Sequence, residues 1–320
     1  MPNEISMSGL NRVPKATSVK RPRKRGGPQH AGRPGPLWAA PALLYFAIFA
    51  LFPLAFAVYL SFTTWDGIRL VPPQFVGLQN WEHLFSDPQA FESLWVTLAV
   101  VAIAVGTQTP LALLVGVWAS GPQRIRAVVV AIYFIPLLIS SAGVSVLFSS
   151  LIDPNFGLPA ALPWLFGDGN LLGHQWTAIG VIGFIYLWGA TPLHTLIYQG
   201  AARAIPPVLY QAAAIDGAGR WRQFFSITLP QLRNTMVTDI ILMIVGTFTT
   251  FDIVLIVTGG GPDQGTAILP YYMYEQGFSA FNLGYGSVIA IVLVVICAAI
   301  SIVMTRVTGY DKMAGSQEGI

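Results

Sequence analysis

The stretch GYGSVIAIVLVVICAAISIVMTRV, residues 284–307, decides the fold, because Arg306 is its only charged residue. An apolar run of about 20 residues is long enough to cross the hydrocarbon core of a bilayer as a helix. Five similar apolar runs precede it, at residues 37–62, 95–119, 127–148, 176–198 and 237–257. We therefore predict an all-α, polytopic membrane protein with six transmembrane helices.

The composition of the whole chain supports this fold class. Its 320 residues are 54% hydrophobic and 10% charged, whereas a soluble domain carries about 25% charged residues. The single cysteine, Cys297, excludes an intrachain disulfide and a cysteine metal cluster. The four histidines have no metal-ligand spacing. We expect no metal site and no catalytic residue in this chain.

The distribution of charge predicts the orientation in the membrane. Of the 17 Lys and Arg residues, all but Arg69 lie in the two terminal segments, in the connections between the second and third and the fourth and fifth runs, or, for Arg306, at the C-terminal end of the last run. The remaining connections contain Arg69 and eight acidic residues. Because cytoplasmic loops retain basic residues, we expect both termini on the cytoplasmic side of the cell membrane.

Three regions follow from this arrangement. Residues 1–36 are rich in Pro, Gly, Lys and Arg, a composition typical of a disordered segment. The basic run KRPRKR, residues 20–25, is interpreted as a contact with anionic membrane lipid rather than with nucleic acid. Residues 37–307 form the transmembrane domain, and residues 308–320 form a cytoplasmic tail.

The cytoplasmic connection at residues 199–236 is long and has its own helix signals. Pro206 and Pro207 can end one helix and begin another. Gly217 and Gly219 then favour a tight turn. A second short helix is predicted over residues 220–229, before Pro230. By itself this pattern is also compatible with a loop that only caps the helices at the membrane surface.

The motifs in this connection resemble those of a known family. YQAAAIDGAG (residues 210–219) and FFSITLP (224–230) are similar to the EAA motif of binding-protein-dependent ABC transporter permeases. DIVL (252–255), TGGGP (258–262), GYGS (284–287) and VGLQNW (76–81) resemble the sugar-type members, so that the resemblance covers about residues 37–307. One departure is Gln211, where the family usually has glutamate.

The resemblance implies an ABC importer type I permease fold and an assembly with other subunits. These are a second homologous permease, two ATP-binding cassette ATPase subunits and an extracytoplasmic solute-binding protein that delivers a carbohydrate. ATP is used by the partner subunit, and the chain lacks a G-x-x-x-x-G-K-[ST] phosphate loop of its own. The residues that the resemblance assigns to ATPase coupling are Tyr210, Gln211, Ala212, Ala213, Asp216, Gly217, Phe224, Ile227 and Pro230.

Candidate substrate residues come from the fourth and fifth apolar runs. A sugar site requires aromatic platforms beside polar groups, and residues four apart share a helix face. The candidates are Phe184, Tyr186, Trp188, Met243, Thr247 and Thr250. The resemblance assigns sugar contacts to Trp188 and Thr247 in particular, whereas helix packing is the alternative role for Phe184 and Tyr186. The absence of clustered Lys or Arg in the runs favours a neutral di- or oligosaccharide.

Two other classes of protein remain as alternatives. An ion-coupled secondary transporter or channel is expected to have inverted repeats and buried acids near the midplane. No such repeat is visible, and Asp239 and Asp252 lie toward the ends of the fifth run. A membrane-embedded hydrolase needs a nucleophile with a base, and His194 has no serine or acid at a diagnostic spacing. We therefore predict that His194 is a packed, hydrogen-bonded residue.

Overall fold

The computed structural model describes residues 36–68, 72–167 and 169–308. The predictions for residues 1–35, for Arg69 and Asp168, and for residues 309–320 fall outside these ranges. The contacts group the chain into two units, Met1–Leu51 and Phe52–Ile320. Nearly all the described elements are helices, as predicted.

The first unit contains, in its described part, η1 (Pro36–Ala39), α1 (Ala40–Phe46) and the π-helical turn η2 (Ala47–Leu51). The rings of Tyr45 and Phe49 lie 4.6 Å apart, centroid to centroid. None of the side chains of α1 and η2 is buried. Because these side chains are apolar, they are suited to contact with lipid tails.

The second unit is predominantly helical. Its first elements are α2 (Phe52–Leu60), β1 (Thr63–Thr64), β2 (Gln74–Phe75), α3 (Gln79–Ser86), α4 (Pro88–Ala119), α5 (Arg124–Tyr133), η3 (Ile135–Leu138), α6 (Ser141–Leu151), α7 (Leu158–Ala161) and α8 (Pro163–Phe166). They are followed by α9 (Gln175–Arg203), α10 (Pro207–Ile215), α11 (Arg220–Gln223), η4 (Phe224–Thr228), α12 (Leu229–Gln231), α13 (Arg233–Thr249), α14 (Asp252–Val257), α15 (Leu269–Tyr274), η5 (Glu275–Ser279) and α16 (Leu283–Thr308). β1 and β2 pair antiparallel, with Thr63 opposite Phe75.

Four helices in the described ranges are long and apolar enough to cross a membrane: Ala40–Leu60, Pro88–Ala119, Gln175–Arg203 and Leu283–Arg306. The third and fifth apolar runs are each divided into shorter helices. Pro136 separates α5 from α6 because its ring provides no backbone N–H. The fifth run leaves the helical conformation at Thr250, where ψ is 120°. The structure is compatible with six spans, although two of them are not continuous helices.

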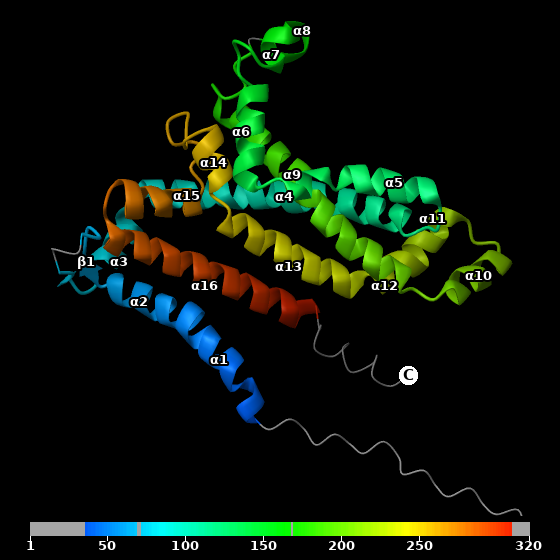
Figure 1. Ribbon diagram of the computed structural model, residues 1–320, viewed down its shortest axis with the longest axis horizontal. Coiled ribbons are helices and arrows are strands. Elements are labelled where there is room, and N and C mark those ends of the chain that lie inside the picture. The colour runs from blue at the N-terminus through cyan, green and yellow to red at the C-terminus, as the bar shows by residue number, and fades with distance from the viewer. Residues whose placement is uncertain (1–35, 69–71, 168, 309–320) are drawn as a thin grey trace, which may run out of the picture. The chain divides into compact units, whose positions relative to one another are not determined.

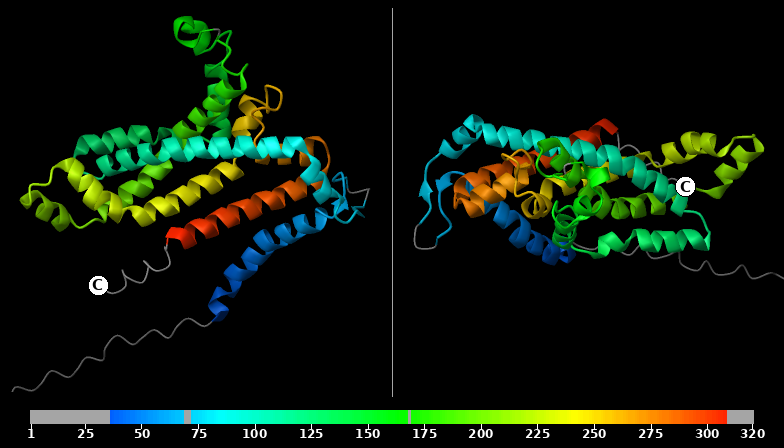
Figure 2. Two further views of the ribbon diagram at one scale, coloured as in Figure 1. Left: turned by 180° about the vertical axis from the view of Figure 1, so that it is seen from behind. Right: turned by 90° about the horizontal axis from the view of Figure 1, so that it is seen from above.

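The centre of the second unit is the packing of α4 along α9, with α13 beside both and α16 next to α13 (Figures 1 and 2). Two glycines allow a close approach of α4 and α9. A Cβ atom added to Gly116 would lie 2.8 Å from the carbonyl oxygen of Thr195, and one added to Gly183 would lie 2.9 Å from Ile103. Small residues at such crossings let membrane helices approach closely.

A buried carboxylate joins three helices at the start of α4. Asp87 caps α4 by accepting a hydrogen bond from the Gln89 N–H, 2.9 Å away. Tyr272 of α15 donates to Asp87 at 2.7 Å, and Tyr285 of α16 donates to the same oxygen. Burial alone would raise the pKa of Asp87, but the hydrogen bonds from Tyr285 and Tyr272, together with those from the backbone at Gln89 and Ala90, outweigh it and lower the pKa.

Candidate functional site

The predicted coupling connection is shorter than the sequence indicated, because α9 continues to Arg203 and α13 begins at Arg233. We call residues 204–232 the coupling segment. Pro207 is the first residue of α10, where its missing N–H costs no hydrogen bond. Gly217 follows α10 with φ +74°, and the Ala218 N–H donates to the Ala213 carbonyl oxygen at 2.8 Å. A left-handed residue of this kind is a common helix end.

Part of the predicted coupling set packs inside the protein. Tyr210 and Thr228 share a hydrogen bond of 2.8 Å between their hydroxyls, which joins α10 to η4. Tyr210, Phe224 and Ile227 pack against a core cluster that includes Tyr198 of α9 and the buried Leu232. These three predicted residues therefore hold the coupling segment against the helix bundle.

The rest of the predicted coupling set is accessible. Gln211, Ala212, Asp216, Gly217 and Pro230 are exposed, and Ala213 is half-buried. With no charge at Gln211, this position offers hydrogen bonds only.

Large apolar side chains that lie outside the predicted set are also exposed on the coupling segment. We call Val208, Ile215, Trp221 and Phe225 the apolar docking face; their exposed fractions are 61%, 88%, 73% and 59%. The rings of Trp221 and Phe225 stack with centroids 6.4 Å apart. Trp221 and Phe225 thus form an exposed aromatic pair, and contiguous apolar groups of this kind are typical of interaction surfaces. Their helical spacing was visible in the sequence, but their exposure was not.

Two of the predicted substrate residues line one cavity. Trp188 is half-buried and Phe184 is exposed on α9. Both border an apolar cavity of about 450 Å³ between α9 and α5, together with Tyr133 and Ile132. Phe148 of α6 contacts both rings edge to face, at centroid distances of 5.9 Å and 5.3 Å. Phe184 also borders a second cavity, of about 480 Å³. Aromatic rings beside such cavities can stack on the apolar face of a sugar.

Tyr186 and Thr250 line a third cavity, of about 230 Å³, on the side of α9 that faces α6 and α14. The Tyr186 hydroxyl donates to the Thr250 carbonyl oxygen at 3.0 Å. This carbonyl lies where α13 ends, so that the bond satisfies a backbone group at the helix break. Ser141, from the same cavity lining, donates to Asp252, the first residue of α14.

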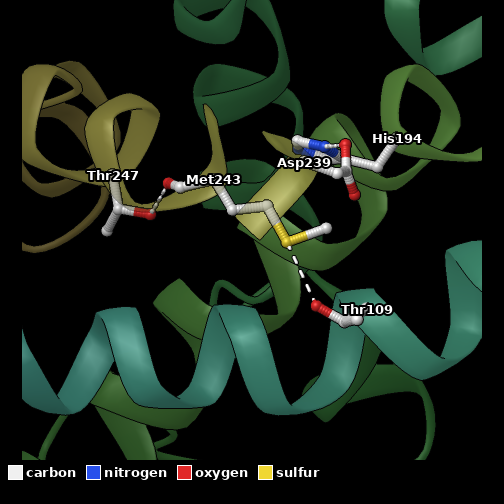
Figure 3. Close-up of polar contacts among 5 residues, drawn as sticks. All are labelled: Thr109, His194, Asp239, Met243 and Thr247. Carbon is white, nitrogen blue, oxygen red and sulfur yellow. Dashed lines mark hydrogen bonds and ion pairs between the residues drawn. The ribbon is translucent and has the colours of Figure 1, made fainter. Parts of the chain in front are cut away.

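Met243 and Thr247 are buried and do not line these cavities (Figure 3). Met243 accepts a hydrogen bond through its sulfur from Thr109 of α4, 3.4 Å away. The Thr247 hydroxyl donates to the Met243 carbonyl oxygen at 2.9 Å. The structure therefore separates the six predicted substrate residues into three groups instead of one site.

A buried pair that the sequence did not predict joins α9 to α13. His194 Nδ1 and Asp239 Oδ1 are 2.7 Å apart, and both side chains are buried (Figure 3). The sequence indicated a packed, hydrogen-bonded histidine but did not identify its partner, because 45 residues separate the two. No group of three or more His, Cys, Asp or Glu side chains suited to a metal ion occurs within residues 36–68, 72–167 and 169–308.

Comparison with known proteins gives one consistent result. The sequence profile of the family described as binding-protein-dependent transport system inner membrane component matches residues 108–309. The probable ABC transporter permease protein YurN of Bacillus subtilis is 30% identical over 276 residues, which cover 84% of this chain and 94% of YurN. The sulfoquinovosyl glycerol transport system permease protein SmoG of Agrobacterium fabrum is 28% identical, with 85% of this chain and 89% of SmoG covered.

A solved structure supports the fold. A chain of a bacterial ABC transporter involved in the import of the acidic polysaccharide alginate matches with a TM-score of 0.73 and 20% identity. The match covers 85% of this chain and 94% of that chain. It confirms the predicted fold of an ABC importer permease. The profile and the relatives together establish that this chain belongs to the family of binding-protein-dependent transport system inner membrane components.

Proposed function

We propose that the chain is the permease subunit of an ATP-driven, solute-binding-protein-dependent carbohydrate importer. The observation that carries the proposal is the apolar docking face on the coupling segment. It offers a binding surface to a separate protein, and the chain has no phosphate loop of its own. ATP is hydrolysed by two separate ATPase subunits, one of which docks on this face, and the chain itself is not an enzyme.

The carbohydrate path lies along α9, where Trp188 and Phe184 border the first cavity. A second homologous permease supplies the opposite wall of this path. The extracytoplasmic solute-binding protein delivers the carbohydrate to this pair of permeases. Relatives named for the transport of sulfoquinovosyl glycerol and of multiple sugars support a carbohydrate as the cargo.

A neutral di- or oligosaccharide is the cargo that fits the cavities best. The residues that line the first three cavities include aromatic rings, hydroxyl groups and aliphatic chains, but no Lys or Arg side chain within the described part of the protein. An acidic polysaccharide such as alginate requires positive groups to balance its charge. Stacking on Trp188 and a hydrogen bond to the half-buried Tyr133 suit a neutral sugar.

The charge distribution supports an orientation with both termini in the cytoplasm and with the coupling segment on the same side. An ion-coupled secondary transporter or channel is disfavoured because it has no use for an exposed apolar face on this segment. Membrane lipid contacts the exposed apolar side chains of α1 and α2.

Affinity purification of the tagged chain with its co-expressed partners tests the proposal. The wild-type chain is expected to retain an ATPase subunit and a second permease. Ile215→Asp places a charge on the most exposed member of the docking face and is expected to remove the ATPase while retaining the second permease. Leu165→Asp, on the exposed helix α8 away from the coupling segment, is the matched control. An unchanged amount of ATPase with Ile215→Asp contradicts the docking role.

A further inference from the structure

The His194–Asp239 pair lies inside the helix bundle, away from water. His194 is about 14 Å before the end of α9 at Arg203, and Asp239 is about 9 Å after the start of α13, at 1.5 Å per residue. Asp239 is completely buried and His194 is 5% exposed. Ionisable residues within membrane segments are rare and are associated with function.

The two side chains form a unit that is neutral overall when they share one proton. This holds for a carboxylate beside an imidazolium and equally for a carboxylic acid beside a neutral imidazole. If only one partner remained, its charged form would be buried without compensation, which is strongly unfavourable. The pair therefore resists separation of α9 from α13 as long as it stays buried.

The position of the pair in the chain connects it to the coupling segment. α9 leads into this segment at residue 204, and α13 continues from it at Arg233. The pair thus joins the two helices between which the segment is inserted. Tyr198, one turn after His194, packs against Leu232 at the end of the segment. A displacement of α10 can reach the bundle through either helix, and the pair makes the two helices move together.

The neighbouring polar atoms do not replace this contact. The buried Tyr198 hydroxyl lies beside the Asp239 carboxylate, but neither it nor Asp239 Oδ2 has a hydrogen bond of regular geometry among the described residues. Thr109 of α4 is bonded to the Met243 sulfur, one turn further along α13 (Figure 3). The nearest alternative partners are therefore neutral or already engaged, and none of them can balance the charge of a lone carboxylate or imidazolium.

We propose that His194 and Asp239 are positioning residues that couple the movement of the coupling segment to α9 and α13 as one body. The proposal rests on the proposed function, because the segment must receive its movement from a docked ATPase. Neither residue contacts the carbohydrate in this arrangement. Their role is to transmit movement to the cavity-lining residues of α9.

The test uses the full assembly in inside-out membrane vesicles. Leu187→Cys, in a Cys297→Ser background, reports access to the first cavity through labelling with a membrane-impermeant maleimide. Mg-ATP with vanadate is the probe that drives the conformational change. In the parent chain the labelling rate is expected to change when the probe is added. His194→Ala and Asp239→Ala are each expected to reduce that change at least about fivefold, the lower range of coupling between sites.

A variant that restores the pair in exchanged order distinguishes a positioning role from a simple loss of packing. The exchange His194→Asp with Asp239→His is expected to recover most of the ATP-dependent labelling change. Thr109→Val removes the adjacent hydrogen bond to Met243 but leaves the pair intact, and it is expected to preserve the change. The proposal is overturned if either single variant keeps the full ATP-dependent change in labelling rate. It is also overturned if the exchange variant loses as much of this change as the two single variants lose together.

A second measurement does not depend on the partners. Thermal unfolding of the purified chain is followed for the wild type, His194→Leu, Asp239→Leu and the double variant. The double variant is expected to be more stable than either single variant, since no unpaired charge remains. If the loss of stability in the double variant equals the sum of the losses in the two single variants, the two side chains do not interact. Absence of any co-purified ATPase with the wild type would instead contradict the proposed function. The comparison of the four unfolding curves would then still test the pair.

Discussion

The hydroxyl of Tyr186 on α9 donates a hydrogen bond to the carbonyl oxygen of Thr250, 3.0 Å away, where α13 ends. A helix that stops inside a membrane leaves carbonyl groups without partners, and each must be satisfied by the protein. Tyr186 satisfies one of them from a neighbouring helix. This contact explains how the fifth apolar run can be divided into α13 and α14. It also gives Tyr186 a structural role that is distinct from contact with a carbohydrate.

Tyr186→Phe tests this role. The substitution removes the hydroxyl and keeps the ring, so that it is expected to lower the free energy of unfolding by about 1 kcal/mol or slightly more. Thermal unfolding in detergent measures the change. Tyr59→Phe, at an exposed tyrosine of α2, is the control and is expected to have no effect. A large loss of transport without loss of stability would show that the Tyr186 hydroxyl contacts the cargo.

Gly217→Val is expected to abolish ATP-dependent transport while membrane insertion is preserved. Gly217 has φ +74°, a conformation that a β-branched residue tolerates poorly, although no atom within 4 Å would collide with a Cβ. Only backbone strain therefore distinguishes it from Gly219, which has φ −67° and equally open surroundings. Uptake by membrane vesicles should be lost with Gly217→Val and retained with Gly219→Val. Equal uptake by both variants would contradict the requirement for a left-handed turn.

Trp188→Ala is expected to reduce uptake or to change the preference among sugars without releasing the ATPase subunit. The indole borders the first cavity and packs edge to face on Phe148, 5.3 Å away. Removal of a stacked aromatic platform costs about 1–3 kcal/mol of binding free energy. Competition between labelled and unlabelled sugars measures the preference. Trp176→Ala, at an exposed position near the start of the same helix, is the control; identical effects of both variants would exclude a specific contact at Trp188.

Asp87 is expected to make the stability of the protein depend on pH in the acidic range. The hydrogen bonds from Tyr285, Tyr272 and the backbone at the start of α4 together overcome the effect of burial and lower the pKa of Asp87 in the folded state. The resulting stabilisation is present above the pKa of an unfolded aspartate, near 3.9, and is lost as pH falls through the lower, folded value. Asp87→Asn is expected to lower the free energy of unfolding by about 1–2 kcal/mol at neutral pH, because bonds to a charged acceptor are stronger.

The pH dependence of Asp87→Asn supplies the control for this prediction. Below about pH 4 the difference between wild type and variant should shrink. Denaturant unfolding at pH 7 and at pH 3 measures this difference in the free energy of unfolding. Glu82→Gln, at an exposed acid of α3, is expected to change stability little at either pH. A difference that stays constant between the two pH values would contradict the role of the ionised carboxylate.

The membrane class and the family could be read from the sequence because both depend on local patterns. Apolar runs such as residues 284–307 identify spans regardless of their neighbours. The turn at Gly217 was predicted for the same reason, since its conformation depends on the residue itself. The division of the third run at Pro136 was within reach of this reasoning. The division of the fifth run at Thr250 was not, because it relies on a donor from α9.

The candidate site was predicted less completely. Spacing along one helix placed Phe184 and Trp188 on a shared face, and both border the first cavity. Spacing also grouped Met243 with Thr247, but it could not show that both are buried or that Met243 contacts Thr109 of α4. In the coupling segment it could not distinguish Tyr210, which packs inward, from Ile215, which is exposed.

By itself the sequence determined what each segment is: an apolar span, a turn or a connection with helix signals. These properties follow from composition and from conformational preferences over a few residues. Only the tertiary structure decided which side chains meet, as His194 and Asp239 do across 45 residues of chain. A buried charge requires a partner, but the sequence does not say which of the distant polar residues supplies it. Helix packing selects that partner, because it brings α9 and α13 into register and excludes water between them.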